Sequence, residues 1–385
     1  MSRQSENRRS GEYSRRPQHR LVRKEADGVK RMLLVCAFCL AAAWGILAVK
    51  NHRDARTAPA EDYLLLIEEA GAQETAPAPV KAEKSAAPTV RLLDSGSVRE
   101  LQEEEYLTEV LLCEMPADFE PEALKAQAVA ARTFLHKKEQ DGKHQDADVC
   151  SDSACCQAWT SREALKKKLG AAFEADYRKA QEAVLATRDE VLVYDGNLID
   201  ATFFSCSGGS TESAAAVWGS DVPYLQSVRS PGEEDAARYE SSVSFSPEDF
   251  KARLCAEGKS PVLSGSPEGW IGDVQYTDGG GVAEMEIGGV QYSGVELRRL
   301  LGLNSTKFTV SVGGKGFSFD VLGYGHRVGM SQYGANEMAQ NGFSCETILL
   351  YYYRGAKIKS LSQISLGQAG TTDTDIKGGS EQTSG

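Results

Sequence analysis

The feature that most constrains this chain is an uncharged apolar segment near its N-terminus. Residues 32–49 (MLLVCAFCLAAAWGILAV) carry no charged side chain over 18 residues, and Lys30, Arg31 and Lys50 flank them. An α-helix needs about 20 apolar residues to cross the hydrocarbon core of a bilayer. A buried helix of a soluble domain would show one polar face, and this segment shows none. A long basic region and no clear small-residue cleavage site disfavour a cleaved signal peptide. The sequence therefore predicts one transmembrane helix at residues 32–49.

The charge of the chain changes sign across this segment. Residues 1–31 hold ten Lys and Arg against four Asp and Glu, a net charge of +6, so the remainder of the −12 chain carries −12 − 6 = −18. Positive charge on the N-terminal side favours a cytoplasmic N-terminus. We expect a single-pass protein of the cell membrane, with residues 1–31 as a basic cytoplasmic segment and residues 50–385 outside the cytoplasm. An acidic body argues against nucleic-acid binding.

Composition divides the rest of the chain into three parts. Residues 50–95 are rich in Ala and Pro and predict an extended linker, while residues 363–385 are rich in Gly, Ser, Thr and Asp and predict a disordered tail. Residues 96–362 remain as one folded unit, which we expect to be two-lobed.

Within this unit, a helical period of apolar residues gives way to an alternating one. The first pattern predicts helices at 97–113, 121–138 and 161–186. The second predicts a hairpin of strands 190–194 and 197–204, further strands at 272–276, 282–287, 308–312 and 317–322, and two helices at 294–301 and 330–341. The expected fold class is α+β, with N-terminal helices packed against a mixed β region.

Glu114 lies where the first of these helices ends, in the apolar stretch LLCEMPADF. Apolar surroundings and the negative end of a helix both disfavour a carboxylate, so the pKa of Glu114 is expected to rise. A carboxyl group with a raised pKa can donate a proton at neutral pH. A surface residue in a helix-terminal loop is the alternative interpretation.

A second cluster combines imidazole and thiol groups. His144, Cys150, Cys155 and Cys156 lie within 13 residues, and this donor set suits Zn²⁺. The spacing differs from that of a zinc finger, and an extracytoplasmic compartment permits disulfides, so the residues leave both a metal site and a disulfide open. Of the nine cysteines, Cys36 and Cys39 fall in the predicted membrane span, and the other seven cannot all pair within the chain.

Two loops are rich in Gly and hydroxyl groups: residues 203–212 (FFSCSGGSTE) and 323–334 (GYGHRVGMSQYG). Many short hydrogen bonds and an aromatic face are what a sugar requires, although ordinary turns can have the same composition. A Ser/His hydrolase built from Ser205 or Ser331 with His326 is disfavoured, because no G-x-S-x-G motif is present. The candidate sugar-binding residues are Ser205, Ser207, Thr211, His326, Ser331, Gln332 and Tyr333.

Three blocks together carry a resemblance to a known family: CEMPADFEPEALKAQAVAARTF, SCSGGSTES with VWGSDVPYL, and GYGHRVGMSQYGANEMA. In this order, behind one predicted transmembrane helix, they resemble the stage II sporulation protein D family and the related amidase-enhancer domains. That family comprises membrane-anchored peptidoglycan lytic transglycosylases of endospore-forming bacteria. The resemblance covers about residues 98–355.

The resemblance implies that Glu114 is the catalytic acid and base. The family cleaves the β-1,4 bond between N-acetylmuramic acid and N-acetylglucosamine in glycan strands without stem peptides, and leaves a 1,6-anhydro sugar. It acts during engulfment of the forespore, together with the amidase stage II sporulation protein P and with stage II sporulation protein M. We expect the second and third blocks to line one groove with Glu114 at its floor.

The resemblance also implies a zinc site of the form His-x5-Cys-x5-Cys, which falls on His144, Cys150 and Cys156. The family often has His where this chain has Cys155, so Cys155 can be a fourth ligand, a neighbour or a redox partner. Phe204 stands where a His is common, which leaves stacking in place of a hydrogen bond. The zinc is expected to be structural.

Two other functions remain open from the sequence. One is a noncatalytic glycan-binding scaffold that stimulates a partner amidase, as the enhancer relatives suggest. The other is a zinc hydrolase with His144, Cys150 and Cys156 as its catalytic centre.

Overall fold

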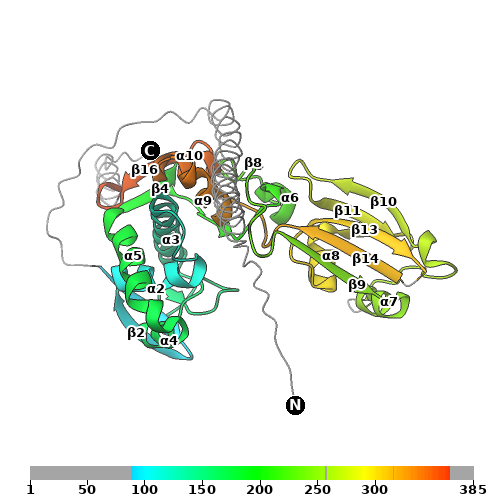
Figure 1. Cartoon of the computed structure of the whole chain (residues 1–385), viewed down its shortest axis with the longest axis horizontal. Helices are drawn as coiled ribbons and strands as arrows, with labels where there is room; N and C mark the ends of the chain where they lie inside the picture. Colours follow the sequence, from blue (N-terminus) through cyan, green and yellow to red (C-terminus); the bar gives the residue numbers. More distant parts are fainter. Residues whose placement is uncertain (1–87, 256–257, 315, 365–385) are drawn as a thin grey trace, which may run out of the picture. The chain divides into compact units, whose positions relative to one another are not determined.

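The computed structural model describes residues 88–255, 258–314 and 316–364 (Figure 1). The predicted basic segment, the transmembrane helix, nearly all of the predicted linker and nearly all of the predicted tail lie outside these ranges. Within them, no helix combines the length and the apolar character that crossing a membrane requires.

The described chain begins with a hairpin that differs from the sequence-based expectation. β1 (Thr89–Asp94) pairs antiparallel with β2 (Ser97–Gln102), and the turn residues Ser95 and Gly96 have φ values of 50° and 83°. Two left-handed residues are the geometry of a tight hairpin turn. Residues 89–94 were expected in the linker and residues 97–102 in a helix. Both expectations are wrong, because the two segments pair as strands and each supplies the backbone hydrogen-bond partners of the other.

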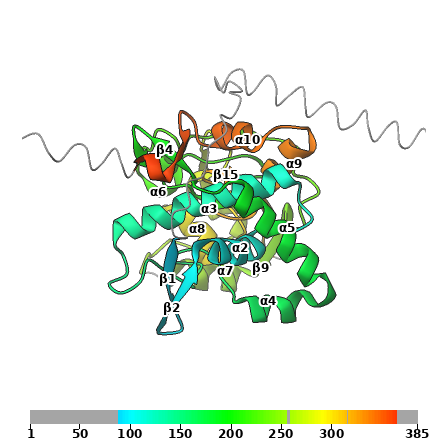
Figure 2. The same cartoon turned by 90° about the vertical axis from the view of Figure 1, so that its left-hand side faces the viewer.

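Helices form the first part of the unit, as expected. The helix after the hairpin is α2 (Glu103–Glu114), which starts with three Glu residues, and acidic side chains favour a helix N-terminus. α3 (Pro121–Asp141) confirms the helix predicted from 121, with Pro121 in its first turn and Gly142 in a left-handed conformation after its end. Figure 2 shows α3 beside α2, and both helices contact α5 (Phe173–Ala186).

The helix expected at 161–186 is interrupted. α4 (Arg162–Leu169) is followed by Gly170, whose positive φ of 58° interrupts the α-helix, and a 3₁₀ turn (Gly170–Ala172) leads into α5.

The first hydrophobic core joins α2 and α3 to the C-terminal helices α9 (Gln332–Gln340) and α10 (Cys345–Tyr352). Leu107, Leu124, Ala131, Met338 and Leu349 are among its fully buried members. The sequence analysis did not predict α10. It predicted α9 from 330, but Met330 and Ser331 form a strand instead.

A second hydrophobic core lies between small antiparallel sheets and two helices. One sheet has the order β13 (Lys307–Gly313), β14 (Gly316–Leu322), β9 (Glu240–Phe245), and the other has the order β10 (Ile271–Tyr276), β11 (Val282–Ile287), β12 (Val290–Ser293). α7 (Pro247–Leu254) and α8 (Gly294–Leu301) contribute their apolar faces, and the Phe250 ring stacks on Phe317 at 4.1 Å between centroids. The strands and the helix predicted here are confirmed.

Short strands connect the segments that carry the candidate residues. β6 (Phe203–Phe204) pairs in parallel with β15 (Met330–Ser331), and β3 (Val149–Cys150) pairs in parallel with β1. β7 (Gly209–Ser210) pairs antiparallel with β8 (Arg229–Ser230). A further sheet has the order β16 (Lys357–Ser360), β4 (Glu190–Tyr194), β5 (Asn197–Leu198). The predicted strand 197–204 is thus divided, because its second half finds a different partner. The fold is α+β, with helices and several small sheets.

Candidate functional site

Glu114 is the last residue of α2, and its side chain is half-buried. The backbone N–H of Ala158 donates to Glu114 Oε1 at 2.8 Å. Burial has the largest effect and raises the pKa of Glu114, whereas hydrogen bonds from Ala158 and the Gln332 side chain lower it. The expectation of a raised pKa is confirmed. The hydrogen bond from Ala158 orients the carboxyl group, and the raised pKa makes it easier to protonate than an exposed Glu, as a proton donor requires.

The first residues of α9 bring the third sequence block to Glu114. Besides its bond to Glu114, the buried Gln332 lies 3.5 Å from Gln127 Oε1 on α3, measured from Gln332 Nε2. The Tyr333 ring meets Phe119, in the loop that follows α2, edge-on at 5.0 Å between centroids. The N–H of Tyr333 donates to the carbonyl of Ser205 at 3.0 Å, which ties the second block to the same place.

The second and third blocks lie side by side over several residues. Phe204 pairs with Ser331 in the β6 and β15 ladder, and isolated bridges join Cys206 to Tyr324 and Glu212 to Val328. The structure therefore brings all three blocks together around the C-terminal end of α2.

Three of the predicted sugar-binding hydroxyl groups have no exposed surface. Ser207, Thr211 and Ser331 are each 0% exposed. The Ser207 hydroxyl donates to Glu233 Oε2 at 2.9 Å, and the Thr211 hydroxyl accepts from the Val228 N–H at 2.8 Å. The Ser331 hydroxyl accepts from the Gly334 N–H at 3.2 Å as the N-cap of α9.

Direct sugar contact does not fit the buried placement of these three residues, which hold the loops instead. Ser205 and Tyr333 are half-buried and so keep an accessible surface.

His326 is also engaged inside the protein. Its Nδ1 accepts from the Val328 N–H at 3.2 Å, and it forms a hydrogen bond with the Phe203 backbone. Burial lowers the pKa of His326 to about 4, so the ring is neutral at pH 7. Neither bond involves a serine hydroxyl, which argues against the Ser/His hydrolase considered from the sequence.

α2 carries a second buried carboxyl group, which no pattern in the sequence indicated. Glu109 is 2% exposed, and it accepts from Trp159 Nε1 at 2.7 Å and from the Arg162 N–H at 2.9 Å. Burial raises the pKa of Glu109 to about 7. No local sequence pattern indicated that Glu109 is buried and hydrogen-bonded, because both of its partners lie some 50 residues further along the chain.

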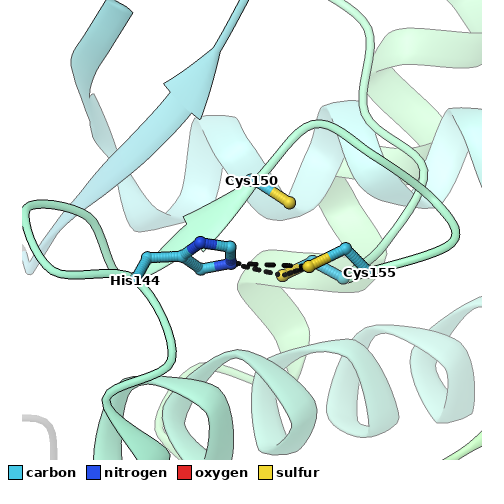
Figure 3. A group of neighbouring side chains, drawn as sticks. His144, Cys150 and Cys155 are labelled. Atoms are coloured by element: carbon cyan, nitrogen blue, oxygen red, sulfur yellow. Dashed lines mark hydrogen bonds between the residues drawn. The ribbon is translucent and has the colours of Figure 1, made fainter. Parts of the chain in front are cut away.

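The His and Cys residues of the second cluster converge on one point (Figure 3). One donor atom each from His144, Cys150, Cys155 and Cys156 lies within 4.8 Å of the other three. His144 Nε2 is 3.3 Å from Cys156 Sγ and 3.7 Å from Cys155 Sγ. Metal–ligand bonds of about 2.1–2.3 Å around a tetrahedral zinc place ligand atoms roughly 3.5–3.8 Å apart. The residues therefore fit a tetrahedral metal ion.

The disulfide interpretation does not fit this cluster. Cys150, Cys155 and Cys156 are all free thiols, and the Cys155 and Cys156 sulfur atoms are 4.0 Å apart, about twice a disulfide bond length. Burial, with the neighbouring thiols, raises the pKa of Cys156 to about 12. Cys155, whose role the sequence left open, belongs to the donor set.

The two residues that follow Cys156, the last donor of the His and Cys cluster, connect this cluster to α3 and to Glu114. After Cys156, the Gln157 side chain donates to the Ala131 carbonyl of α3 at 3.0 Å, and Ala158 donates to Glu114. The segment that follows the cluster is therefore bound to both helices beside the candidate acid.

A buried ion pair stabilises the glycine-rich loops, and the sequence analysis did not identify it either. Arg327 and Glu212 are 0% and 1% exposed, with Arg327 Nη1 at 3.0 Å from Glu212 Oε1. Arg327, with a left-handed φ of 67°, also donates to the carbonyls of Ser207, Ser210 and Gly279 at 2.6–2.7 Å. Glu212 accepts from the Gly281 N–H at 3.0 Å. The pair thus ties both loops to the turn between β10 and β11.

Comparison with known proteins agrees with this arrangement of blocks. The family model described as Stage II sporulation protein (SpoIID) matches residues 94–194. Stage II sporulation protein D of Bacillus subtilis (strain 168) is 39% identical over 266 residues, which cover 68% of this chain and 76% of that protein. The amidase enhancer of Bacillus subtilis (strain 168) is 29% identical over 297 residues, which cover 64% of this chain and 39% of the enhancer. With this identity and coverage, the chain belongs to the stage II sporulation protein D family.

Proposed function

We propose that this protein is a peptidoglycan lytic transglycosylase that cleaves the β-1,4 bond between N-acetylmuramic acid and N-acetylglucosamine and leaves 1,6-anhydro ends. The observation that carries the proposal is Glu114, a carboxyl group with a raised pKa that Ala158 and Gln332 orient beside the second and third blocks. Membership of a sporulation protein family supports a role in engulfment of the forespore.

One carboxyl group is enough for this reaction. Glu114 donates its proton to the oxygen of the glycosidic bond as that bond breaks, and the Glu114 carboxylate then accepts the proton of the C6 hydroxyl. That hydroxyl attacks the anomeric carbon in place of water and closes the 1,6-anhydro ring. A usual glycosidase needs a second carboxylate to activate water or form a covalent bond. Glu109 is not available for this role, because it is 2% exposed and its oxygen atoms are bound to Trp159 and Arg162 inside the fold.

The substrate in this proposal is a glycan strand without stem peptides. Gln332 hydrogen-bonds Glu114, and the half-buried Tyr333 and Ser205 are joined by a backbone hydrogen bond. These three residues are the candidates for direct contact with the strand. The buried Ser207, Thr211 and Ser331 would shape the loops around the strand.

The cofactor in this proposal is a structural Zn²⁺, held by His144, Cys150, Cys155 and Cys156. Zinc would supply a cross-link between the segment 144–156 and the helices that carry Glu114. Four protein ligands close the coordination sphere and leave no position for a catalytic water. This closed donor set disfavours the zinc hydrolase considered from the sequence.

The location and partners also remain proposals. A transmembrane helix at 32–49 would hold the folded unit at the outer face of the membrane and raise its local concentration at the wall. Stage II sporulation proteins P and M are the partners that the family resemblance implies, and the amidase enhancer relative agrees with an amidase as partner.

The test is product analysis with the purified full-length protein and glycan strands stripped of stem peptides. We expect products one water lighter than reducing-end fragments, and Glu114→Gln should lower the rate about 10²–10⁴-fold. Glu100→Gln, an exposed carboxyl group on β2, is the matched control and should cleave normally. Reducing ends from the wild-type protein would contradict the transglycosylase assignment.

The amidase enhancer relative supports a second candidate function, a noncatalytic scaffold that stimulates an amidase. Full engulfment in cells that carry Glu114→Gln would favour the scaffold over the enzyme.

A further inference from the structure

Trp218 is an exposed aromatic residue between the two glycine-rich loops. It is the last residue of α6 (Ala214–Trp218), and 46% of its surface is exposed. The other Trp residues in the described part of the chain, Trp159 and Trp270, are 8% and 7% exposed. Gly219, with a left-handed φ of 74°, ends the helix immediately after Trp218. The local structure thus presents the indole at the surface.

The indole is the outer member of a row of three rings. The Trp218 ring lies 5.5 Å from the His326 ring, and the His326 ring lies 5.7 Å from the Phe204 ring, as measured between centroids. Phe204 is buried, so the row runs from the interior to the surface. Trp218 belongs to the second sequence block, Phe204 directly precedes that block, and His326 belongs to the third.

His326 supports this row through fixed contacts. Both of its hydrogen bonds go to the backbone, from the Val328 N–H and to Phe203, and its ring is neutral at pH 7. No polar atom of His326 is left for a ligand. Its remaining contribution is its ring face, which holds the indole of Trp218 in place.

The row starts close to Glu114. Phe204 pairs with Ser331, and the next residue, Gln332, hydrogen-bonds Glu114. The three rings therefore extend outward from the immediate surroundings of the candidate acid.

We infer that Trp218 is a stacking platform for an N-acetylhexosamine ring of the glycan strand, and that His326 acts as its support rather than as a direct sugar ligand. The apolar C–H face of a pyranose and its acetamido methyl group suit a flat, uncharged indole. This inference rests on the proposed function only for the class of ligand, a β-1,4-linked N-acetylhexosamine polymer.

The test measures binding without turnover. In full-length protein that carries Glu114→Gln, the dissociation constant for a neutral β-1,4-linked N-acetylglucosamine hexamer is measured by calorimetry. Trp218→Ala should weaken binding roughly tenfold, whereas Trp218→Phe keeps an aromatic face and should stay within about threefold. Tyr276→Ala is the matched control, since Tyr276 is an aromatic residue 58% exposed on β10, outside the row. The affinity of Tyr276→Ala for the hexamer should equal that of the protein that carries Glu114→Gln alone.

Fluorescence supplies an independent readout. Trp218 is the exposed Trp in the described part of the chain. Binding of the hexamer should therefore shift the wavelength of the tryptophan emission and protect that emission from quenching by iodide. Trp218→Phe should remove both effects. Unchanged affinity in Trp218→Ala, or a full fluorescence response in Trp218→Phe, would overturn the inference.

The outcomes also separate this inference from the proposed function. Wild-type protein that cleaves glycan while Trp218→Ala binds normally defeats the platform alone. Wild-type protein that binds through Trp218 without forming anhydro ends supports the platform and contradicts the transglycosylase.

Discussion

The backbone N–H of Ala158 donates to Glu114 Oε1 at 2.8 Å, and Ala158 lies two residues after Cys156 of the His and Cys cluster. The same short segment therefore carries a donor of the cluster and a hydrogen bond to the candidate acid. Any change that loosens the cluster should also change the orientation of Glu114.

The first prediction concerns the fourth donor of the cluster. Cys155→Ser should weaken metal binding by at least roughly tenfold, because a serine hydroxyl is a poor substitute for a thiolate ligand of zinc. The metal content and affinity of the purified protein, measured by mass spectrometry and competition with a chelator, check this. The thermal midpoint and the cleavage rate should fall together. Cys255→Ser, an exposed thiol outside the cluster, should change neither. Cys155→Ser with wild-type metal affinity would show that three ligands suffice.

The second prediction concerns the pH dependence of cleavage. Glu114 must be protonated to donate, so kcat/KM should fall as the pH rises through the pKa of Glu114. The hydrogen bond from Gln332 lowers that pKa. Gln332→Met removes the bond at similar volume, so the alkaline limb of the pH profile should move to higher pH. An alkaline limb that moves to lower pH, or stays in place, would count against Glu114 as the titrating acid.

The third prediction concerns the pH dependence of stability. The pKa of Glu109 is raised in the folded state from 4.5 to about 7. A raised pKa means that the stabilisation is complete below pH 4.5 and is lost as the pH rises through 7. The expected loss in the free energy of unfolding is on the order of 2–3 kcal/mol. Urea denaturation at pH 5 to 8 measures it.

Glu109→Gln does not titrate and provides the comparison. The stability advantage of the wild-type protein over Glu109→Gln should shrink from pH 5 to pH 8. The exposed-site control Glu100→Gln should keep the wild-type dependence of the free energy of unfolding on pH. A constant difference between wild type and Glu109→Gln across this range would refute the prediction.

The fourth prediction concerns the buried pair of Arg327 and Glu212. Arg327→Met leaves the Glu212 carboxylate buried without its cation, so the free energy of unfolding should fall by about 3–5 kcal/mol. The double variant Arg327→Met with Glu212→Gln removes the charge and should recover part of this loss. Denaturant unfolding of Arg327→Met, of Glu212→Gln and of the double variant gives the coupling free energy between the two side chains. Strictly additive losses would mean that the pair is not coupled.

The elements that the sequence predicted well have strong local signals. α3 combines a helical period of apolar residues with Pro121 at its start and Gly142 after its end, and α8 and β11 have the same bounds as predicted. The elements that it missed depend on distant partners. Residues 97–102 form a strand because residues 89–94 pair with them, and β6 and β15 are two-residue strands that exist only as a pair.

The site shows the same division. The apolar context of Glu114 was sufficient to predict a raised pKa. The residue types and spacing of His144, Cys150 and Cys156 left a metal site and a disulfide open, and the family resemblance favoured a metal. The burial of Ser207, Thr211 and Ser331 could not be predicted, because a Gly and Ser composition is the same for a loop that faces solvent and one that faces the core.

The sequence by itself predicted the α+β class and the raised pKa of Glu114, since these depend on residue type and local pattern, and the family resemblance supplied three of the proposed metal donors. Only the tertiary structure decided that Cys155 joins the donor set, that Ala158 reaches Glu114, and that Glu109 and His326 are occupied by internal hydrogen bonds. The physical reason is that hydrogen bonds and metal ligation act over about 3–4 Å. Whether two segments come that close is set by how the cores pack.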